Sequence, residues 1–245
     1  MTSQRRAIDV RGVLQAGGRG ERIGADERSG PKPLFKVSGT PMVERLLRQF
    51  VAAGIRSVTV ITGWMGDRVE AHLRSLDDLP GDLAIDFIRE SHPRGNLGAL
   101  ADLPREPRPV LMSFADLVTE LDFAELVAVH EEGGARITLA SHYESYRVRL
   151  GELQSEGRRV VAYREKPEKR FLICSGIGVF ERPVLDLLPS DRPAGIADLV
   201  TAALDGGHEV IHWSHGALWM DVNSPEELEE AHRELTARRP QRGRS

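Results

Sequence analysis

The chain has 245 residues, with 33 Lys and Arg against 37 Asp and Glu and a formal net charge of −4 at pH 7. This length suits one large α/β domain, and the lack of a basic excess argues against a nucleic-acid partner. No apolar run is long enough to cross a membrane and no signal-peptide pattern is present, so we expect no membrane segment. The single cysteine, Cys174, excludes an internal disulfide and favours a cytoplasmic location.

Apolar runs alternate with helical patterns through the first half of the chain. Strands are predicted at 12–15, 57–62, 83–88 and 110–114. Helices are predicted from Pro41, with Thr40 as cap and Gly54 as stop, at 66–76, and from near Gly95. This alternation predicts an α/β fold with a Rossmann-like mixed, mostly parallel sheet and helices on both faces.

From Arg136 the pattern changes to shorter strand-like pieces, followed by two helices. The predicted strands are 137–141, 148–153, 160–164 and 172–180, and the predicted helices are 196–204 and 225–237. We expect residues 1–9 to be an N-terminal extension, 10–236 a single domain, and 237–245 a flexible basic tail.

A glycine-rich turn follows the first predicted strand, within the segment VLQAGGRGERIGADERSGPKPL at residues 13–34. Its glycines allow backbone N–H groups to approach a polyphosphate without Cβ atoms in the way. Arg22 and Lys32 add the positive charge that phosphate oxygens need. The segment therefore predicts a binding site for a nucleoside triphosphate.

Two common glycine motifs do not fit this turn. The dinucleotide fingerprint requires a glycine where Ile23 stands, and the P-loop requires a Gly-Lys-Ser/Thr that is absent. No Gly-x-Ser-x-Gly elbow occurs either, so covalent catalysis by serine is not indicated.

Two aspartates stand close to strand ends without an evident capping duty. Asp116 follows the strand at 110–114, and Asp122 is better placed to cap the next helix. Asp221 precedes Ser224 and Glu227, which themselves form a capping box for the last helix. Carboxylates are suitable ligands for Mg²⁺, which takes oxygen donors.

The glycine turn, with its arginine and the later Lys-Pro-Leu, resembles the pattern of the sugar-1-phosphate nucleotidyltransferase family. The matching residues are Ala16, Gly17, Gly18, Gly20, Arg22, Lys32, Pro33 and Leu34. The resemblance implies a nucleotide-binding half at 10–135 and a sugar-phosphate-binding half at 136–236. It also implies an enzyme that joins an NTP to a sugar 1-phosphate, or a related cyclitol or polyol phosphate, and releases pyrophosphate.

The same resemblance implies roles for residues around the nucleotide. Arg22 and Lys32 would be catalytic, and the nucleotide would contact Gln15, Ala16, Gly17, Gly18, Gly20, Glu90, Gly95 and Asn96. A carboxylate at Glu90 could accept two hydrogen bonds from guanine, which favours GTP. Glu90 could equally be a surface acid at the end of a strand, and the sequence leaves both interpretations open.

The metal and acceptor residues follow from further matches. FADLVTELDFAELVAVH and WMDVNSPEEL resemble the segments that carry the family's metal aspartates, which implies Mg²⁺ at Asp116 and Asp221, although Ala115 and Asn223 depart from the pattern. The implied sugar-phosphate residues are Gly151, Glu165, Lys166 and Gly176. Cys174 and Ser175 replace an Asn-Ala pair, so the acceptor is expected to differ from a standard hexose 1-phosphate.

Two other functions fit parts of the sequence. A cytidylyltransferase for an alcohol phosphate shares the glycine turn, although its usual Lys-Gln differs from Lys32-Pro33. A non-catalytic regulatory homologue would be expected to lose the arginine, the lysine or the acids, and all four are present. The eight histidines show no metal-ligand spacing and are interpreted as surface or helix residues. The sequence is compatible with a homo-oligomer.

Overall fold

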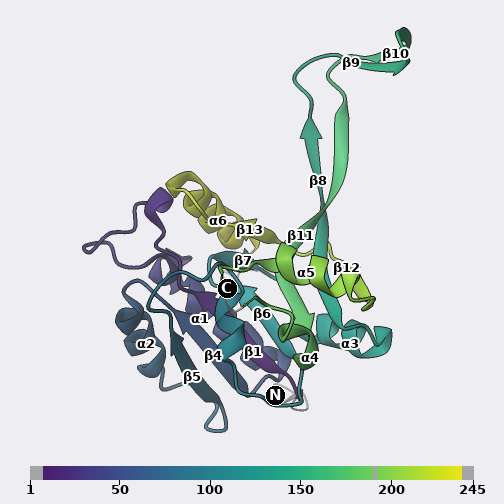
Figure 1. Ribbon diagram of the computed structural model, residues 1–245. Helices are drawn as coiled ribbons and strands as arrows, with labels where there is room; N and C mark the ends of the chain where they lie inside the picture. Colours follow the sequence, from purple (N-terminus) through teal and green to yellow (C-terminus); the bar gives the residue numbers. More distant parts are fainter. Residues whose placement is uncertain (1–7, 190–191, 239–245) are drawn as a thin grey trace, which may run out of the picture.

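The computed structural model describes residues 8–189 and 192–238, and a seven-stranded sheet forms its centre (Figure 1). The strand order is β12-β8-β11-β6-β1-β4-β5, and β11 is antiparallel to both of its neighbours while the other pairs are parallel. The strands are β1 (Arg11–Ala16), β4 (Ser57–Thr62), β5 (Ala84–Arg89), β6 (Val110–Phe114), β8 (Ile137–Arg147), β11 (Glu168–Phe180) and β12 (Val210–Ser214). The predicted mixed, mostly parallel sheet is confirmed.

Helices cover both faces of this sheet because successive strand residues point to opposite sides. Val13 packs into an apolar cluster with Leu199, whereas its neighbour Leu14 packs into another cluster with Phe50. The Leu14 side is covered by α1 (Met42–Ala53), α2 (Gly66–Arg74) and α3 (Phe123–Gly133), and the Val13 side by α4 (Arg182–Leu185) and α5 (Ile196–Asp205). A third cluster joins α6 (Pro225–Arg238) to Val37 and Val222.

The start of α1 differs from the prediction. Thr40 does not cap this helix, because β3 (Thr40–Pro41) pairs with β2 (Lys36–Val37) in a small hairpin. The turn between them has positive φ at both residues, 50° at Ser38 and 87° at Gly39. Pro41 is therefore the N-cap residue and the helix begins at Met42.

The helix predicted from near Gly95 is absent, and a short 3-10 helix at Gly98–Asp102 stands in its place. The backbone before it pairs with a distant residue instead of closing helical hydrogen bonds. Leu97 donates its N–H to the carbonyl of Ala194, and Ala194 donates in turn to the carbonyl of Arg94. This pairing ties the segment to the loop before α5.

A long hairpin projects from the body of the molecule (Figure 1). The outer parts of β8 and β11 form its shaft, and β9 (Glu152–Glu156) pairs with β10 (Arg159–Arg164) at its tip. We call residues 143–172 the arm. The strand predicted at 148–153 is wrong at its start, because residues 148–151 connect β8, which ends at Arg147, to β9, which begins at Glu152.

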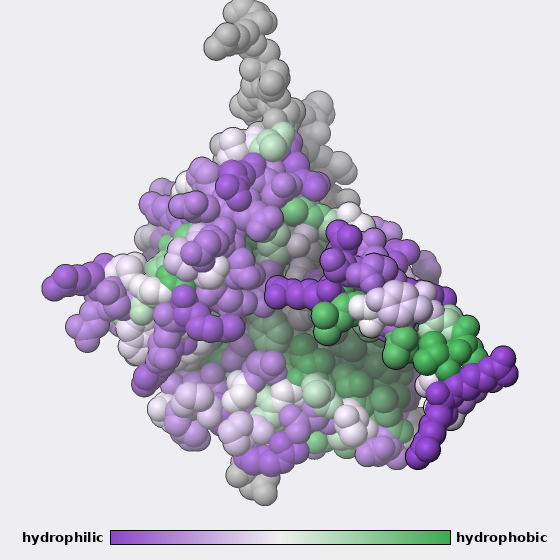
Figure 2. Space-filling model, turned by 90° about the horizontal axis from the view of Figure 1, so that it is seen from above, coloured by the Kyte–Doolittle hydropathy of each residue, from purple (hydrophilic) through white to green (hydrophobic). Residues whose placement is uncertain are grey.

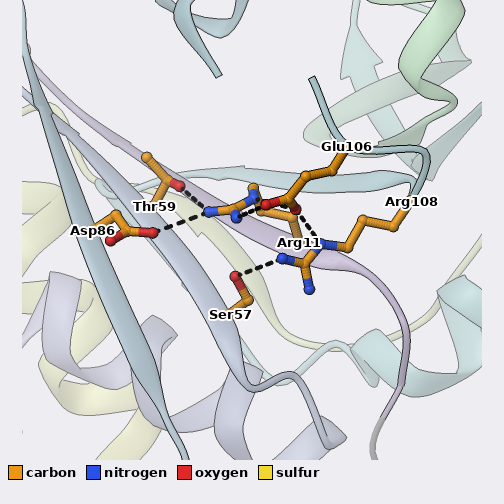
Figure 3. A network of polar contacts seen from close by, with 6 residues as sticks. All are labelled: Arg11, Ser57, Thr59, Asp86, Glu106 and Arg108. Carbon is orange, nitrogen blue, oxygen red and sulfur yellow. Dashed lines mark hydrogen bonds and ion pairs between the residues drawn. The ribbon is translucent and has the colours of Figure 1, made fainter. Parts of the chain in front are cut away.

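A buried cation ties the amino ends of the strands together, at the edge of the sheet opposite to the carboxyl ends (Figure 3). Arg11 is only 5% exposed. Its guanidinium lies 2.8 Å from Glu106 Oε1, 2.9 Å from Thr59 Oγ1 and 3.2 Å from Asp86 Oδ2. Hydrogen bonds from Arg108 and Arg11 outweigh partial burial and lower the pKa of Glu106.

Replacing Glu106 with alanine is expected to lower the free energy of unfolding by about 2 kcal/mol, because the Arg11 charge loses its best-placed partner. Urea denaturation would measure this. Asp86→Ala is the matched control, since that carboxylate is 62% exposed and its loss should cost below about 1 kcal/mol. The lowered pKa implies that the Glu106 contribution is complete above pH 4.5 and disappears as the pH falls through the folded-state value. An equal loss in both variants at neutral pH would contradict this account.

None of the helices in the described part of the chain has the length and hydropathy needed to cross a bilayer. The predicted N-terminal extension and basic tail fall mainly on residues 1–7 and 239–245, which lie outside the described residues.

Candidate functional site

The carboxyl ends of four neighbouring strands surround a cavity of about 570 Å³. This is the edge at which open α/β sheets bind ligands, and the volume is in the range of small-molecule sites. The sequence-predicted residues on its wall are Gln15, Gly17, Gly18, Glu90, Gly95, Asn96 and Asp116. Ala16 is buried in β1, and Gly20 lies further along the turn.

Close packing explains two glycines of the turn. A Cβ atom on Gly17 would lie 2.8 Å from a carboxylate oxygen of Glu90. One on Gly20, whose φ is +68°, would lie 2.6 Å from Cβ of Lys32. The turn can therefore approach both the floor of the cavity and the lysine only without side chains at these positions.

Lys32 connects the glycine turn to the acidic side of the cavity. It begins a short 3-10 helix, Lys32–Leu34, and is 6% exposed. Its Nζ donates to Asp116 Oδ2 and to Asn223 Oδ1, both at 2.8 Å. The exposed Arg22 also donates to Asn223 Oδ1, at 3.0 Å. One amide thus holds both predicted catalytic cations beside the predicted metal aspartates.

The two aspartates meet because β7 (Leu117–Thr119) pairs with β13 (Trp219–Asp221). The backbone N–H of Val222 donates to the carbonyl of Asp116 at 3.2 Å, which places Asp221 next to it. Partial loss of water contact and the nearby Asp116 carboxylate raise the pKa of Asp221. A pair of carboxylates that repel each other in this way favours a cation between them.

This donor set fits a magnesium ion. Two carboxylates supply hard oxygen ligands, and Mg²⁺ usually keeps several waters or phosphate oxygens beyond one or two carboxylates. The described residues contain no group of three or more His, Cys, Asp or Glu side chains arranged to hold a metal by themselves. The arrangement therefore suits an ion shared with a phosphate ligand.

Glu90 lies deep in the cavity and not on the surface as a strand-end acid. Its side chain is 6% exposed, and Gln15 Nε2 lies 3.4 Å from its Oε2. Within the described residues, Glu90 Oε1 and Gln15 Oε1 are buried without a hydrogen-bond partner. Burial raises the pKa of Glu90. These acceptors are suited to a ligand that brings its own N–H donors.

Gly95 and Asn96 are held by the loop before α5. Gly95 has φ +79°, and a Cβ there would lie 2.3 Å from the carbonyl oxygen of Ala194. The side-chain oxygen of Asn96 accepts from the N–H of Ile196 in the first turn of α5. Asn96 thus has a structural role as well as a place on the cavity wall.

The structure separates the predicted acceptor residues into two groups. Gly176 lies in the body with φ +70°, where a Cβ would come 2.8 Å from the ring of Phe114. Gly151, Glu165 and Lys166 lie instead on the arm, away from the cavity (Figure 1). There Glu165 accepts a hydrogen bond from Tyr163. The predicted sugar-phosphate residues are therefore not together in one copy of the chain.

A second opening at the base of the arm was not predicted. Ser175, which is fully buried, lies 2.9 Å from both His142 Nδ1 and His215 Nε2. Trp219 stacks on His142 at 4.4 Å and donates its indole N–H to the carbonyl of Ser175. The interpretation of these histidines as surface or helix residues is wrong, because strand register brings them together. The only sequence signal was the serine in the place of the family's alanine.

Gly63 and Trp64 on the cavity wall were also missed. They follow the end of β4, and strand-end position was the signal that could have identified them. Asn223 was noted only as a departure from a glycine, and nothing in the sequence pattern indicated its bonds to Arg22 and Lys32.

Residues 11–238 match the family model for nucleotidyl transferases. The chain is 30% identical over 232 residues to a mannose-1-phosphate guanylyltransferase of Mycobacterium tuberculosis, covering 89% of this chain but 62% of that protein. It is 22% identical to a glucose-1-phosphate cytidylyltransferase of Salmonella typhi, covering 88% and 91%. A solved structure from Bacillus anthracis in complex with a sucrose has a TM-score of 0.69 at 20% identity, covering 96% and 98%.

The family match extends over the sheet, the glycine turn and both aspartate-bearing strands. It includes every residue that lines the cavity. The chain therefore belongs to the nucleotidyl transferase family.

Proposed function

We propose that the protein transfers a nucleoside monophosphate, with GTP favoured, to a sugar 1-phosphate or a related cyclitol or polyol phosphate, and releases pyrophosphate. The observation that carries this is the convergence of Lys32, Arg22 and Asp221 around Asp116 and Asn223, beside a cavity of about 570 Å³ that Asp116 lines. The mycobacterial relative named as a guanylyltransferase supports the reaction class. A cytoplasmic location belongs to the same proposal.

The proposed chemistry needs no protein nucleophile. An oxygen of the acceptor phosphate attacks the α-phosphorus in line, the bond from that phosphorus to the bridging oxygen breaks, and pyrophosphate leaves. Arg22 would hold the leaving pyrophosphate, and Lys32 would stabilise the charge on the transferring phosphoryl group. Asp116 and Asp221 would hold Mg²⁺, which would supply charge neutralisation where the two polyanions meet.

The preference for guanine is supported by Glu90, whose Oε1 is buried without a hydrogen-bond partner among the described residues, although Arg94 Nε lies 3.8 Å from it. Guanine presents two adjacent donors, N1–H and its exocyclic amine, to a carboxylate such as Glu90. Cytosine presents one exocyclic amine, and uracil or thymine presents one ring N–H, so each would leave a buried acceptor without a partner. A cytidylyltransferase activity, as named for the Salmonella relative, is the second outcome that the same cavity could accommodate.

The direct test is pyrophosphate release by purified protein with each NTP and a panel of sugar 1-phosphates and polyol phosphates. We expect release with GTP and one acceptor of this panel. Release only with CTP would identify a cytidylyltransferase. Nucleotide binding without release for every pair would indicate a non-catalytic homologue and overturn the proposal.

Replacing Glu90 with glutamine is expected to lower kcat/KM for GTP by about 10- to 100-fold, because an amide presents one acceptor and one donor to guanine. The expected change for CTP or UTP is smaller, since these bases use fewer acceptors. Glu209→Gln, at an exposed position, is the matched control. Equal losses for all nucleotides would show that Glu90 does not contact the base.

A further inference from the structure

Trp64 lies on the wall of the nucleotide cavity, two residues after the end of β4, and its side chain is partly exposed. The other two tryptophans of the chain, Trp213 and Trp219, each have a histidine ring beside them. Within residues 8–189 and 192–238, the indole of Trp64 has neither a ring or cation stacked on it nor a hydrogen-bond partner. An indole in this state on the wall of a cavity is suited to contact a ligand.

A tight turn fixes the position of Trp64. The N–H of Gly66 donates to the carbonyl of Gly63 at 3.0 Å, which places Trp64 and Met65 at the two central positions of the turn. Met65 has φ 53°, in the left-handed region that residues other than glycine seldom adopt. Backbone in such a conformation persists only where its surroundings impose it, and positions of this kind concentrate at binding sites. Trp64 is therefore held in one place on the cavity wall.

The turn that carries Trp64 packs against the glycine turn. A Cβ atom on Gly63 would lie 2.6 Å from the carbonyl oxygen of Gly17, so the two backbones are in direct contact. On the other side, the N–H of Glu90 donates to the carbonyl of Thr62 at 2.8 Å, in continuation of the pairing between β4 and β5. Trp64 thus lies near both the turn predicted to bind phosphate and the carboxylate predicted to contact the base.

The order of the strands gives the cavity two chemically different ends. Asp116 follows β6 at one end and Glu90 follows β5 at the other, with β1 and β4 between them. Neighbouring strands are about 4.8 Å apart, so the two strand ends are separated by about 14 Å. The phosphates belong beside Asp116 and Lys32, and Trp64, which follows β4, is on the half of the cavity that is left for the base. Figure 2 is seen from the side of these strand ends and shows apolar residues, in green, recessed among hydrophilic ones.

We propose that Trp64 stacks on the base of the bound nucleotide and favours purines, because their larger ring system overlaps more of the indole. Glu90 contacts the edge of the base and Trp64 contacts its face. The edge contact distinguishes guanine from the other bases, whereas the stacking contact distinguishes only the size of the ring system. This inference rests on the proposed function in that the ligand is a nucleotide, and it does not require the release of pyrophosphate.

Equilibrium binding in the absence of an acceptor tests this contact. Trp64→Ala is expected to raise the Kd for GTP about tenfold or more, the effect typical of removing an aromatic partner of a base. The Kd for ATP should rise by the same factor, because stacking does not depend on the edge of the base, and the Kd for CTP should rise less. The Kd for inorganic triphosphate, which has no base, should not change. Titration calorimetry in the presence of Mg²⁺ would measure all four.

Two conservative variants are the matched controls. Trp64→Phe keeps a ring at this position and should recover most of the affinity that Trp64→Ala loses. Trp213→Phe, at a tryptophan that packs on His215 and does not line the cavity, should bind GTP normally. Circular dichroism should show that all three variants are folded.

Three results would contradict the proposal. An unchanged Kd for GTP in Trp64→Ala would show that the indole does not contact the base. An equal rise in the Kd for inorganic triphosphate would show that the substitution disturbs the glycine turn instead. An equal rise for CTP would show that Trp64 does not favour purines.

Fluorescence gives a second readout that does not depend on affinity. A base stacked on an indole quenches its emission, so saturating GTP should lower the emission of the unmodified protein and of Trp213→Phe. This quenching should be absent in Trp64→Phe at saturating GTP, although that variant still binds the nucleotide. Quenching that persists in Trp64→Phe would show that another indole responds, and would overturn the proposal.

Failure of this contact and failure of the proposed function give different results. If Trp64→Ala changes nucleotide binding as expected but no acceptor leads to pyrophosphate release, the stacking contact stands and the proposed reaction is wrong. If pyrophosphate is released and the Kd for GTP is unaffected by Trp64→Ala, the reaction stands and the contact is wrong. A protein that binds no nucleoside triphosphate would overturn both.

Discussion

Lys32→Ala is expected to lower pyrophosphate release by about 10²- to 10³-fold, with a smaller change in the KM for the NTP. Lys32 is buried, and its Nζ lies 2.8 Å from both Asp116 and Asn223, so it is a fixed charge beside the proposed path of the phosphoryl group. A fixed charge in a site shielded from water stabilises developing charge more than the same group does at the surface. Steady-state kinetics with saturating Mg²⁺ would measure the effect.

The matched control for this lysine is Lys36→Ala, four residues along the chain and exposed. It should retain essentially full activity. Circular dichroism should show that both variants are folded. If Lys32→Ala turned over within about threefold of the unmodified rate, Lys32 would be a structural partner of Asp116 and not a catalytic group.

Asp221→Asn is expected to lower activity by about 10²-fold or more, because the pair of carboxylates that would hold Mg²⁺ is broken. The Mg²⁺ concentration for half-maximal rate should rise at the same time. Asp205→Asn, at an exposed position in the last turn of α5, is the matched control. Unchanged Mg²⁺ dependence in Asp221→Asn would remove this residue from the metal site.

The same substitution, which is expected to lower activity, should raise the stability of the metal-free protein. Partial loss of water contact and the Asp116 carboxylate raise the pKa of Asp221, whose side chain stays in part accessible to solvent, above its ordinary value of 3.8, so the folded state binds more protons than the unfolded state between these two pKa values. Stability therefore falls as the pH rises through that window, and the charged form is unfavourable at pH 7. Asp221→Asn should raise the Tm of the chelator-treated protein at pH 7. A lower Tm would show that the carboxylate is stabilised by its surroundings.

Much of the fold could be predicted because it is encoded locally. The strands at 57–62 and 110–114 agree with β4 and β6, since strands buried on both faces of a parallel sheet are rich in apolar and β-branched residues. The N-cap of α3 at Asp122 is confirmed by its bonds to the N–H groups of Ala124 and Glu125. The helix expected near Gly95 failed because its backbone pairs with Ala194, far along the chain.

In the candidate site too, features that are local in sequence could be predicted, whereas contacts between distant residues could not. The glycine turn and Lys32 could be found from spacing, because the motif that contains them is continuous in sequence. The bonds of Asn223 to Arg22 and Lys32 could not be found, since they join residues about 200 positions apart. Their assigned roles, and those of Glu165 and Lys166, stay predictions until the variants are measured.

By itself, the sequence determined most of the order of strands and helices, the place of the glycine turn and the strand-end position of the two aspartates, because periodicity, glycine content and strand ends are local properties. Only the tertiary structure decided that two cations share one amide, that Ser175 joins two histidines, and that the arm leaves the body. Each of these depends on strand register and on the direction in which a ribbon leaves the sheet, and contacts between distant residues set both.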